Sequence, residues 1–289
     1  MPILPPAAPS PESPGRHAAR HRLSLDGVLR LWNDRIGSYA ELAAKPSIPL
    51  RVCIHGPSDG PWSGLADLRV LLVADVLTRI AELNGLQVVA VLAAASLPPG
   101  AFDQNASALG IHPPAACASP EEAEALLGGP AHVHVARNTA GLGDRDDGML
   151  VGVGPVRDLK PEDGGRAAER QASAGNGCDL LALRLALLSR SHRQPVKLTP
   201  ATLAAAADSL GRWRCRVAEW AGEPSRPIPP ETASKIRNAF DEDLNTVAAF
   251  AVLHDVESGR DMPAGAKFET FAFVDRVLGL ELTREIGHQ

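Results

Sequence analysis

Four side chains of metal-binding types lie at the ends of two apolar segments. Cys53 and His55 are two residues apart, and so are His132 and His134. Residues two apart in a β-strand point to the same face, so each pair could present its donor atoms together. Thiolate and imidazole are donors that zinc prefers, which makes a metal site conceivable. We favour a plainer interpretation, in which Cys53 is a small buried residue and the paired histidines lie in a solvated loop or edge strand.

The first of these pairs belongs to a predicted strand, loop, helix and strand. Leu50 to Ile54 is a short apolar run, followed by a stretch of turn formers at residues 56–61. Residues 65–83 carry apolar side chains at helical spacing, and residues 86–94 are continuously apolar, as in a strand buried on both faces. Such a βαβ unit has a right-handed crossover in nearly all folds, so a parallel sheet is predicted.

The rest of the chain divides into two parts. Further helices are predicted over 102–109 and 120–127, strands over 131–136 and 149–153, and then only helices, over 180–188, 199–220, 230–240, 246–257 and 267–278. We therefore predict an α/β, Rossmann-like domain over residues 22–177 and a helical bundle over residues 178–289. The Pro-, Ala- and Ser-rich residues 1–21 are expected to form a disordered tail.

Composition limits the classes of function. The chain has 289 residues, 45% of them apolar, and a net charge of −5, so its overall field does not attract polyanions. The four cysteines are scattered singly and no secretory leader is recognised, which favours a cytoplasmic location with free thiols. No apolar stretch approaches the roughly 20 residues of a membrane helix, so no membrane association is expected.

Five local strings, in order, resemble the class I cysteinyl-tRNA synthetase family, which includes the ligase that joins cysteine to a glucosamine-inositol in mycothiol synthesis. They are Leu29 to Asn33; Arg51 to Cys53 with Gly56 to Ser58; Arg69 with Ala74 to Leu77; Ala108 to Ile111 with Pro113 and Pro114; and Ala182 to Arg184 with Leu187 to Ser189 and Phe240 to Thr246. The resemblance covers about residues 25–282. It implies the synthetase-type parallel sheet followed by a helical bundle.

The resemblance also implies a nucleotide site that has lost its chemistry. In the family, signature histidines and a lysine-rich loop meet the charge that develops during adenylate formation. The matching positions here are Gly64 to Asp67, with no imidazole and a carboxylate where a phosphate should lie, and Val156 to Lys160. The implied nucleotide-binding residues are Gly64, Leu65, Ala66, Asp67, Arg69, Gly154, Arg157 and Lys160. The implied substrate-binding residues are Cys53, Gly56, Pro57, Ser58 and Trp62, with Trp62 expected to close over the mouth of the site.

Zinc is not expected from the resemblance, whereas ATP is a candidate ligand. The family binds cysteine through a zinc ion held by four protein ligands, because a soft thiolate distinguishes cysteine from serine. Only Cys53 matches one of these ligands. The stretch Asn138 to Asp146, which would supply the others, contains no Cys, His or Glu.

Two functions stay open. The first is a synthetase-like protein without aminoacylation activity that binds a nucleotide, a small amino-acid or thiol ligand, or a protein partner. The alternative is a divergent ATP-dependent ligase that activates cysteine for a tRNA or a small amine. The chain ends soon after Leu282, where a full synthetase continues into further anticodon-binding structure, so tRNA decoding is not expected.

Several charged and aromatic groups in the helical part have structural interpretations. Trp213 and Trp220, seven residues apart, are interpreted as helix-packing residues. The acidic run Asp241 to Asp243 is interpreted as a helix entry rather than a calcium loop. A solvated helix face explains a basic region at least as well as RNA contact does; it comprises Arg184, Arg190, Arg193, Arg212, Arg214 and Arg216.

Overall fold

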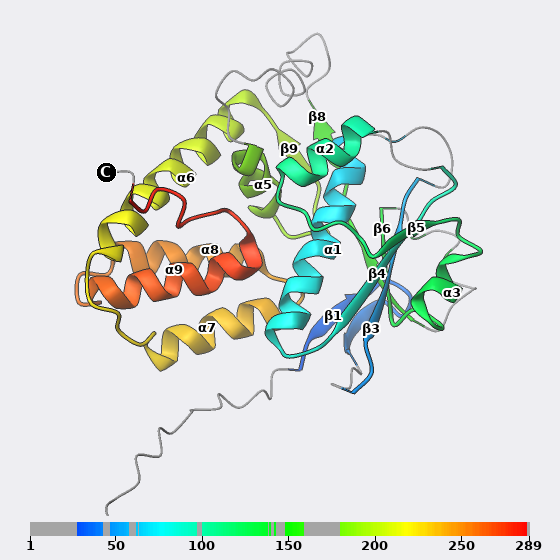
Figure 1. The fold of residues 1–289 in the computed structure, drawn as a ribbon, viewed down its shortest axis with the longest axis horizontal. Helices are drawn as coiled ribbons and strands as arrows, with labels where there is room; N and C mark the ends of the chain where they lie inside the picture. The colour runs from blue at the N-terminus through cyan, green and yellow to red at the C-terminus, as the bar shows by residue number, and fades with distance from the viewer. Residues whose placement is uncertain are drawn as a thin grey trace, which may run out of the picture.

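The fold is that of a parallel α/β sheet packed against a group of helices, as shown by a computed structural model (Figure 1). The structure describes residues 28–42, 47–57, 62, 64–96, 100–137, 139, 142, 148–158 and 180–287. The predicted tail at residues 1–21 lies outside the described residues.

Five parallel strands form the sheet, in the order β5-β4-β3-β6-β7, which confirms the predicted fold class. The strands are β3 (Leu50–His55), β4 (Val88–Ala93), β5 (Ala116–Ala118), β6 (Val133–Ala136) and β7 (Met149–Gly152). Strands β3 and β6 are neighbours in the interior of the sheet, with Cys53 directly opposite His134. Parallel pairing places the carboxyl ends of β3, β4 and β6 at one edge.

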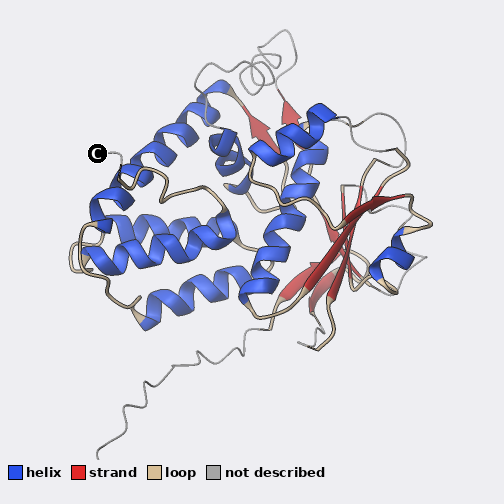
Figure 2. Cartoon of the chain, viewed as in Figure 1, coloured by secondary structure: helices blue, strands red, loops and turns tan. Residues whose placement is uncertain are grey.

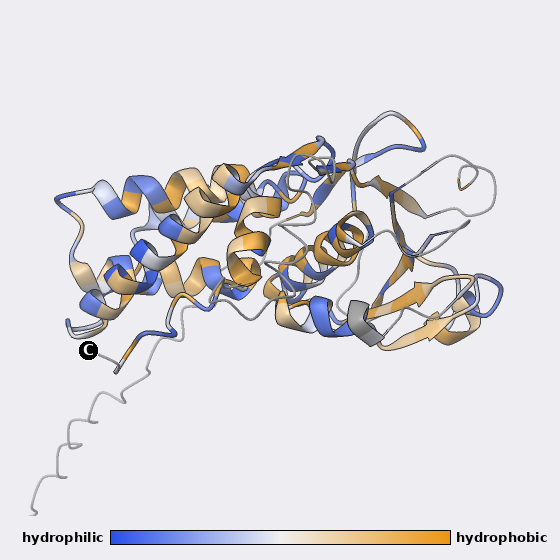
Figure 3. Cartoon of the chain, turned by 90° about the horizontal axis from the view of Figure 1, so that it is seen from above, coloured by the Kyte–Doolittle hydropathy of each residue, from blue (hydrophilic) through white to orange (hydrophobic). Residues whose placement is uncertain are grey.

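Helices cover both faces of this sheet. The helix α1 (Leu65–Leu83) packs on one face, and α3 (Ala123–Leu127) packs on the other (Figure 1). Figure 3 shows how apolar residues gather on α1 and the strands. The helix α1 ends where predicted, because Gly85 adopts a φ of 80°, a left-handed conformation that glycine reaches without steric cost. A short helix, α2 (Gly100–Ala108), follows β4.

The remaining helices pack beside α1 on the side away from the sheet (Figure 2). They are α5 (Leu180–Leu188), α6 (Pro200–Ala221), α7 (Pro230–Asp241), α8 (Thr246–Ser258) and α9 (Ala264–Leu278). The predicted caps are confirmed: Thr199 accepts from the Thr202 amide and Asn245 accepts from the Ala248 amide. Trp213 is 1% exposed and lies in this core, as its spacing predicted.

Short strands escaped prediction. A hairpin of β1 (Arg30–Asn33) and β2 (Ser38–Glu41) lies beside β7, and β8 (Val156–Asp158) pairs in parallel with β9 (Val196–Leu198). Each of these strands carries only one or two apolar residues, too few to show a hydrophobic period, so only the partner strand identifies them. None of the described helices is long and apolar enough to cross a membrane.

The prediction of a solvated basic face was wrong for two of its six arginines. Arg184 is fully buried, and Arg214 is 6% exposed. Arg214 donates to the carbonyl oxygens of Leu280 and Glu281, so it fastens the segment after α9 onto α6. The acidic run also has a tertiary role, because Asp243 accepts from the Trp32 amide and Asp241 accepts from the Asn84 side chain. These carboxylates join the end of α7 and the turn between α7 and α8 to β1 and to the end of α1.

Candidate functional site

The carboxyl edge of the sheet is the place where open α/β sheets bind ligands. Strand β3 ends there at His55, and α1 begins beside it after Gly64, whose φ of 61° is left-handed. The predicted site residues Pro57 and Leu65 are buried there, and Ala66 is half-buried in the first turn of α1. The predicted residues Ser58 and Lys160 lie outside the described residues.

Gly56 and Trp62 form one wall of this edge. A Cβ atom on Gly56 would lie 2.7 Å from the Ala94 Cβ and 3.1 Å from the Trp62 ring, so only glycine fits without a shift. The indole Nε1 of Trp62 donates to the Ser96 carbonyl, 3.3 Å away. Trp62 therefore bridges the chain segments that follow β3 and β4, and its half-buried ring leaves a face for contact.

An ion pair lies at the start of α1. Asp67 is 5% exposed, and its Oδ1 is 3.4 Å from Nη1 of Arg137, the residue that follows β6. A carboxylate in the first turn of a helix is stabilised by the positive end of the helix dipole. Sequence reasoning missed Arg137, although a cationic residue directly after a predicted parallel strand could have signalled it. The side chain of Arg137 is 36% exposed, so a ligand could reach it.

Arg69 does not face this edge. Its guanidinium is 1% exposed and donates to the carbonyl oxygens of Gly154 (2.7 Å), Gln194 (2.8 Å) and Ser191 (2.9 Å). Burial lowers the pKa of Arg69 to about 10, which still leaves it protonated at neutral pH. Arg69 thus ties α1 to the loops around β8 and β9, and its donors are directed to backbone rather than to a phosphate.

Gly154 lies at this junction, where α1 meets the loops around β8 and β9. A Cβ on Gly154 would lie 2.5 Å from the carbonyl oxygens of Arg193 and Gln194, so a larger residue would push these loops apart. Arg157, in β8, is exposed and lies beside Lys197 of β9. The predicted nucleotide-binding residues are therefore spread over two places, with Asp67 at the sheet edge and Arg69 and Gly154 in the junction.

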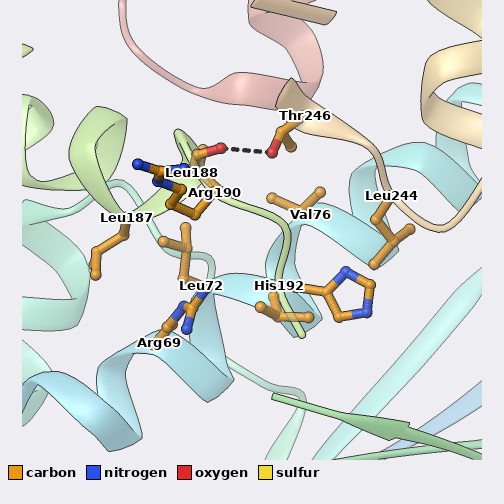
Figure 4. Close-up of a pocket in the computed structure, with 10 residues that line it drawn as sticks. Arg69, Leu72, Val76, Leu187, Leu188, Arg190, His192, Leu244 and Thr246 are labelled. Atoms are coloured by element: carbon orange, nitrogen blue, oxygen red, sulfur yellow. Dashed lines mark hydrogen bonds between the residues drawn. The ribbon is translucent and has the colours of Figure 1, made fainter. Parts of the chain in front are cut away.

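A small cavity lies next to Arg69, between α1, α5 and the turn before α8 (Figure 4). Its volume is about 10 Å³, which is room for about one water molecule and not for a nucleotide. Figure 4 shows the Thr246 hydroxyl donating to the Leu188 carbonyl at this cavity. His192 lies at its border, and burial lowers the pKa of His192 to about 3, so this imidazole is neutral. The cavity is part of the packing of α1 against α5 and the turn before α8.

The metal-binding types singled out in the sequence meet on the α3 face of the sheet. Cys53, His55 and His134 bring one donor atom each to within 4.8 Å of one another. His134 is 4% exposed in an interior strand, so the interpretation as a solvated loop or edge strand was wrong for this residue. Cys53 is 4% exposed, as expected for a small buried residue. The cross-strand register, which places Cys53 opposite His134, is what brings these residues together.

His132 takes a different role. Its Nδ1 accepts from the Arg51 amide at 2.9 Å, and its Nε2 is 3.1 Å from the Arg51 guanidinium. Burial and the nearby Arg51 charge lower the pKa of His132, so the neutral form is favoured. His132 therefore aligns the start of β6 with β3 and is not part of the cluster.

Comparison with known proteins identifies the relatives of this chain. It is 37% identical over 112 residues to the L-cysteine:1D-myo-inositol 2-amino-2-deoxy-alpha-D-glucopyranoside ligase of Streptomyces griseus, and 34% identical over 114 residues to that of Thermobifida fusca. It is 31% identical over 134 residues to the cysteine–tRNA ligase of Thermosynechococcus vestitus. The chain is related to the cysteine ligases.

The relationship to the cysteine ligases covers part of each protein. The matched segments span 37%, 37% and 38% of this chain and 26%, 26% and 27% of the three relatives, respectively. The chain thus matches about a quarter of the length of these cysteine ligases. No protein-family model matches the chain.

Proposed function

We propose that this protein is a cysteine-ligase-like protein that binds a small amino acid or thiol at the carboxyl edge of its sheet and does not form an adenylate. The observation that carries the proposal is the Asp67–Arg137 pair at the start of α1. The exposed side of Arg137 can bind one carboxylate, while Asp67 holds the guanidinium in place and limits the positive charge.

This charge arrangement favours a small acid over a nucleotide. A triphosphate carries several negative charges and needs several cations or donors around it. Here a buried carboxylate occupies the first turn of α1, and the nearby Arg69 has its donors directed to carbonyl oxygens. An amino acid brings only one carboxylate, and its ammonium group adds a charge that Asp67 does not repel. The site is therefore better matched to a zwitterion than to ATP.

Ligand-dependent melting tests the binding. At a cysteine concentration one hundred times the dissociation constant, binding stabilises the native state by about 2.7 kcal/mol. For a chain of this size, that raises the melting temperature by about 4 to 5 °C. We expect this rise with cysteine and no comparable rise with ATP. A rise with ATP alone would contradict the proposal, and no rise with either ligand would favour a scaffold that binds a protein partner.

The variant Arg137→Gln tests the site. Losing a charge-assisted contact to the ligand carboxylate should weaken cysteine binding by about tenfold or more. The matched control is Arg216→Gln, which removes an exposed arginine paired with Glu219 on α6, far in sequence from the sheet edge. Isothermal titration calorimetry measures both affinities. Equal affinities for Arg137→Gln and the control would place the ligand elsewhere.

The second candidate function is a divergent ATP-dependent ligase that activates cysteine for a tRNA or a small amine. It is favoured by the names of the relatives, which are cysteine ligases. ATP–pyrophosphate exchange in the presence of cysteine separates it from the first proposal. We expect no cysteine-dependent exchange above background, and robust exchange would support the ligase instead.

Trp62 offers a direct reporter of the occupied site. The Trp62 ring lies against Gly56 at the carboxyl edge of the sheet. A ligand bound there should therefore change the environment of the indole and quench the Trp62 fluorescence. The change should disappear in Trp62→Phe, which keeps an aromatic ring in place. The control is Trp220→Phe in the helical bundle, which should keep the quenching. Undiminished quenching in Trp62→Phe would show that Trp62 does not cover the ligand.

A further inference from the structure

The cluster of Cys53, His55 and His134 has the arrangement of a metal centre. Cys53 and His55 are two residues apart on β3 and so point to the same face, which is the face covered by α3. His134 lies directly across from Cys53 on β6. The Nε2 of His55 is 3.0 Å from the Nδ1 of His134, and the two rings are stacked with centroids 5.2 Å apart.

The donor types favour zinc or a similar ion. A thiolate and two imidazoles are the borderline-soft ligands that zinc binds, at bond lengths of about 2.0 to 2.3 Å. Ligands on one tetrahedral ion are therefore about 3 to 4 Å apart. The three donor atoms already lie within 4.8 Å of one another, so small side-chain rotations would suffice. Without a metal, one of the two facing imidazole nitrogens must carry a proton, and a metal ion can replace that proton.

The surroundings hold the ligands in place. Cys53 and His134 lie on two interior strands whose register is set by the sheet, and sites built on strands are more rigid than sites on loops. A Cβ on Gly148 would lie 3.0 Å from the His134 ring, so the close backbone limits the movement of this imidazole. Around Cys53 the neighbours are apolar, which strengthens metal–ligand electrostatics. The apolar neighbours are Val91, Ala93, Ala123, Leu127 and Ala131.

We propose that Cys53, His55 and His134 bind one zinc-class divalent metal ion. This ligand set is not the one that the family resemblance implies, since both imidazoles come from positions outside it. Three protein ligands among the described residues leave a fourth tetrahedral position for solvent or for an exogenous thiolate. The alternative is a hydrogen-bonded histidine pair beside an inert thiol. Metal binding is measured without any organic ligand, so its outcome does not depend on the proposed function.

Cobalt(II) is the probe for this site. The full chain is treated with a chelator and titrated with cobalt(II), which reports a thiolate ligand by charge-transfer absorption in the near ultraviolet and tetrahedral geometry by visible bands. We expect both signals to saturate at one equivalent per chain and to disappear when zinc is added. Zinc should also raise the melting temperature of the chelator-treated protein.

Two variants and one control assign the signal to these residues. Cys53→Ser should abolish the charge-transfer band, and His55→Gln should weaken metal binding by at least about tenfold. Cys117→Ser, which changes an exposed cysteine on β5, should keep both signals. His55 is half-buried at the end of β3, so His55→Gln remains informative if Cys53→Ser does not fold.

Three outcomes would overturn the proposal. The first is the absence of cobalt binding by the wild-type protein, which would leave the histidine pair as a structural contact. The second is an unchanged charge-transfer band in Cys53→Ser or its loss in Cys117→Ser. The third is an equal zinc-dependent rise in melting temperature for wild-type protein and His55→Gln. None of these outcomes changes the expected effect of cysteine on the Arg137→Gln variant.

Discussion

Replacing Arg184 with methionine is expected to lower the free energy of unfolding by about 3 to 5 kcal/mol, the usual cost of leaving a buried charge without its partner. The Arg184 side chain is fully buried and donates to Asp75, 2.6 Å away, and to the carbonyl oxygens of Leu109 and Leu278. Methionine would leave these acceptors inside the protein with fewer donors. Urea denaturation of both proteins measures the difference.

The expected loss comes from burial, because exposed ion pairs contribute little. Arg216→Met, which removes an exposed arginine on α6, should change the free energy of unfolding by less than about 0.5 kcal/mol. In the double variant Arg184→Met with Asp75→Asn, part of the loss should be recovered because the buried negative charge that faced Arg184 is gone. Arg79 also contacts Asp75, at 2.9 Å, and limits the loss. A change below about 1 kcal/mol in Arg184→Met would show that the network is not stabilising.

Replacing Arg69 with methionine is expected to cost about 3 kcal/mol of unfolding free energy, because a buried side chain is lost and several partly buried carbonyl oxygens lose their donor at once. Those of Gly154, Gln194 and Ser191 accept from Arg69 at 2.7 to 2.9 Å. Lysine at this position should cost nearly as much, since one ammonium group cannot match the planar fork of a guanidinium. Chemical denaturation measures the loss.

The same variant separates a structural role for Arg69 from ligand binding. If Arg69 only holds the junction, Arg69→Met should be less stable but should bind cysteine as tightly as the wild-type protein does. Calorimetry at a temperature where both proteins are folded provides the comparison. A variant of unchanged stability that has lost nucleotide binding would restore Arg69 as a phosphate ligand, as the resemblance had suggested.

Local sequence patterns were sufficient to predict the longer helices and strands. The helix α1 was predicted with its bounds, because its apolar spacing and the Asn84-Gly85 stop lie within a single stretch of chain. The same holds for β3 and for the capped starts of α6 and α8, where Thr199 and Asn245 act on residues three positions away. The strands β8 and β9 were missed because each is three residues long and forms only by pairing with the other, which is distant in sequence.

The site could be predicted only in part. Cys53 and Trp62 lie at the sheet edge or on its face, as expected from the end of a parallel strand. The surroundings of Arg69 could not be predicted, because nothing in the sequence shows that its guanidinium would meet backbone carbonyls more than 80 positions away. Arg137 was missed because its ion pair is with Asp67, 70 positions earlier in the chain, which only the tertiary contact shows.

The sequence by itself determined the parallel α/β class, the helical second part and the relationship to cysteine ligases, since these depend on hydrophobic periods and local strings. Only the tertiary structure decided which polar groups are buried and what they face. Cys53 and His134 became neighbours through the register of β3 and β6, and Arg184 became a buried ion-pair partner of Asp75 through helix packing. The physical reason is that a side chain's environment is set by residues distant in sequence, whereas periodicity is set by those nearby.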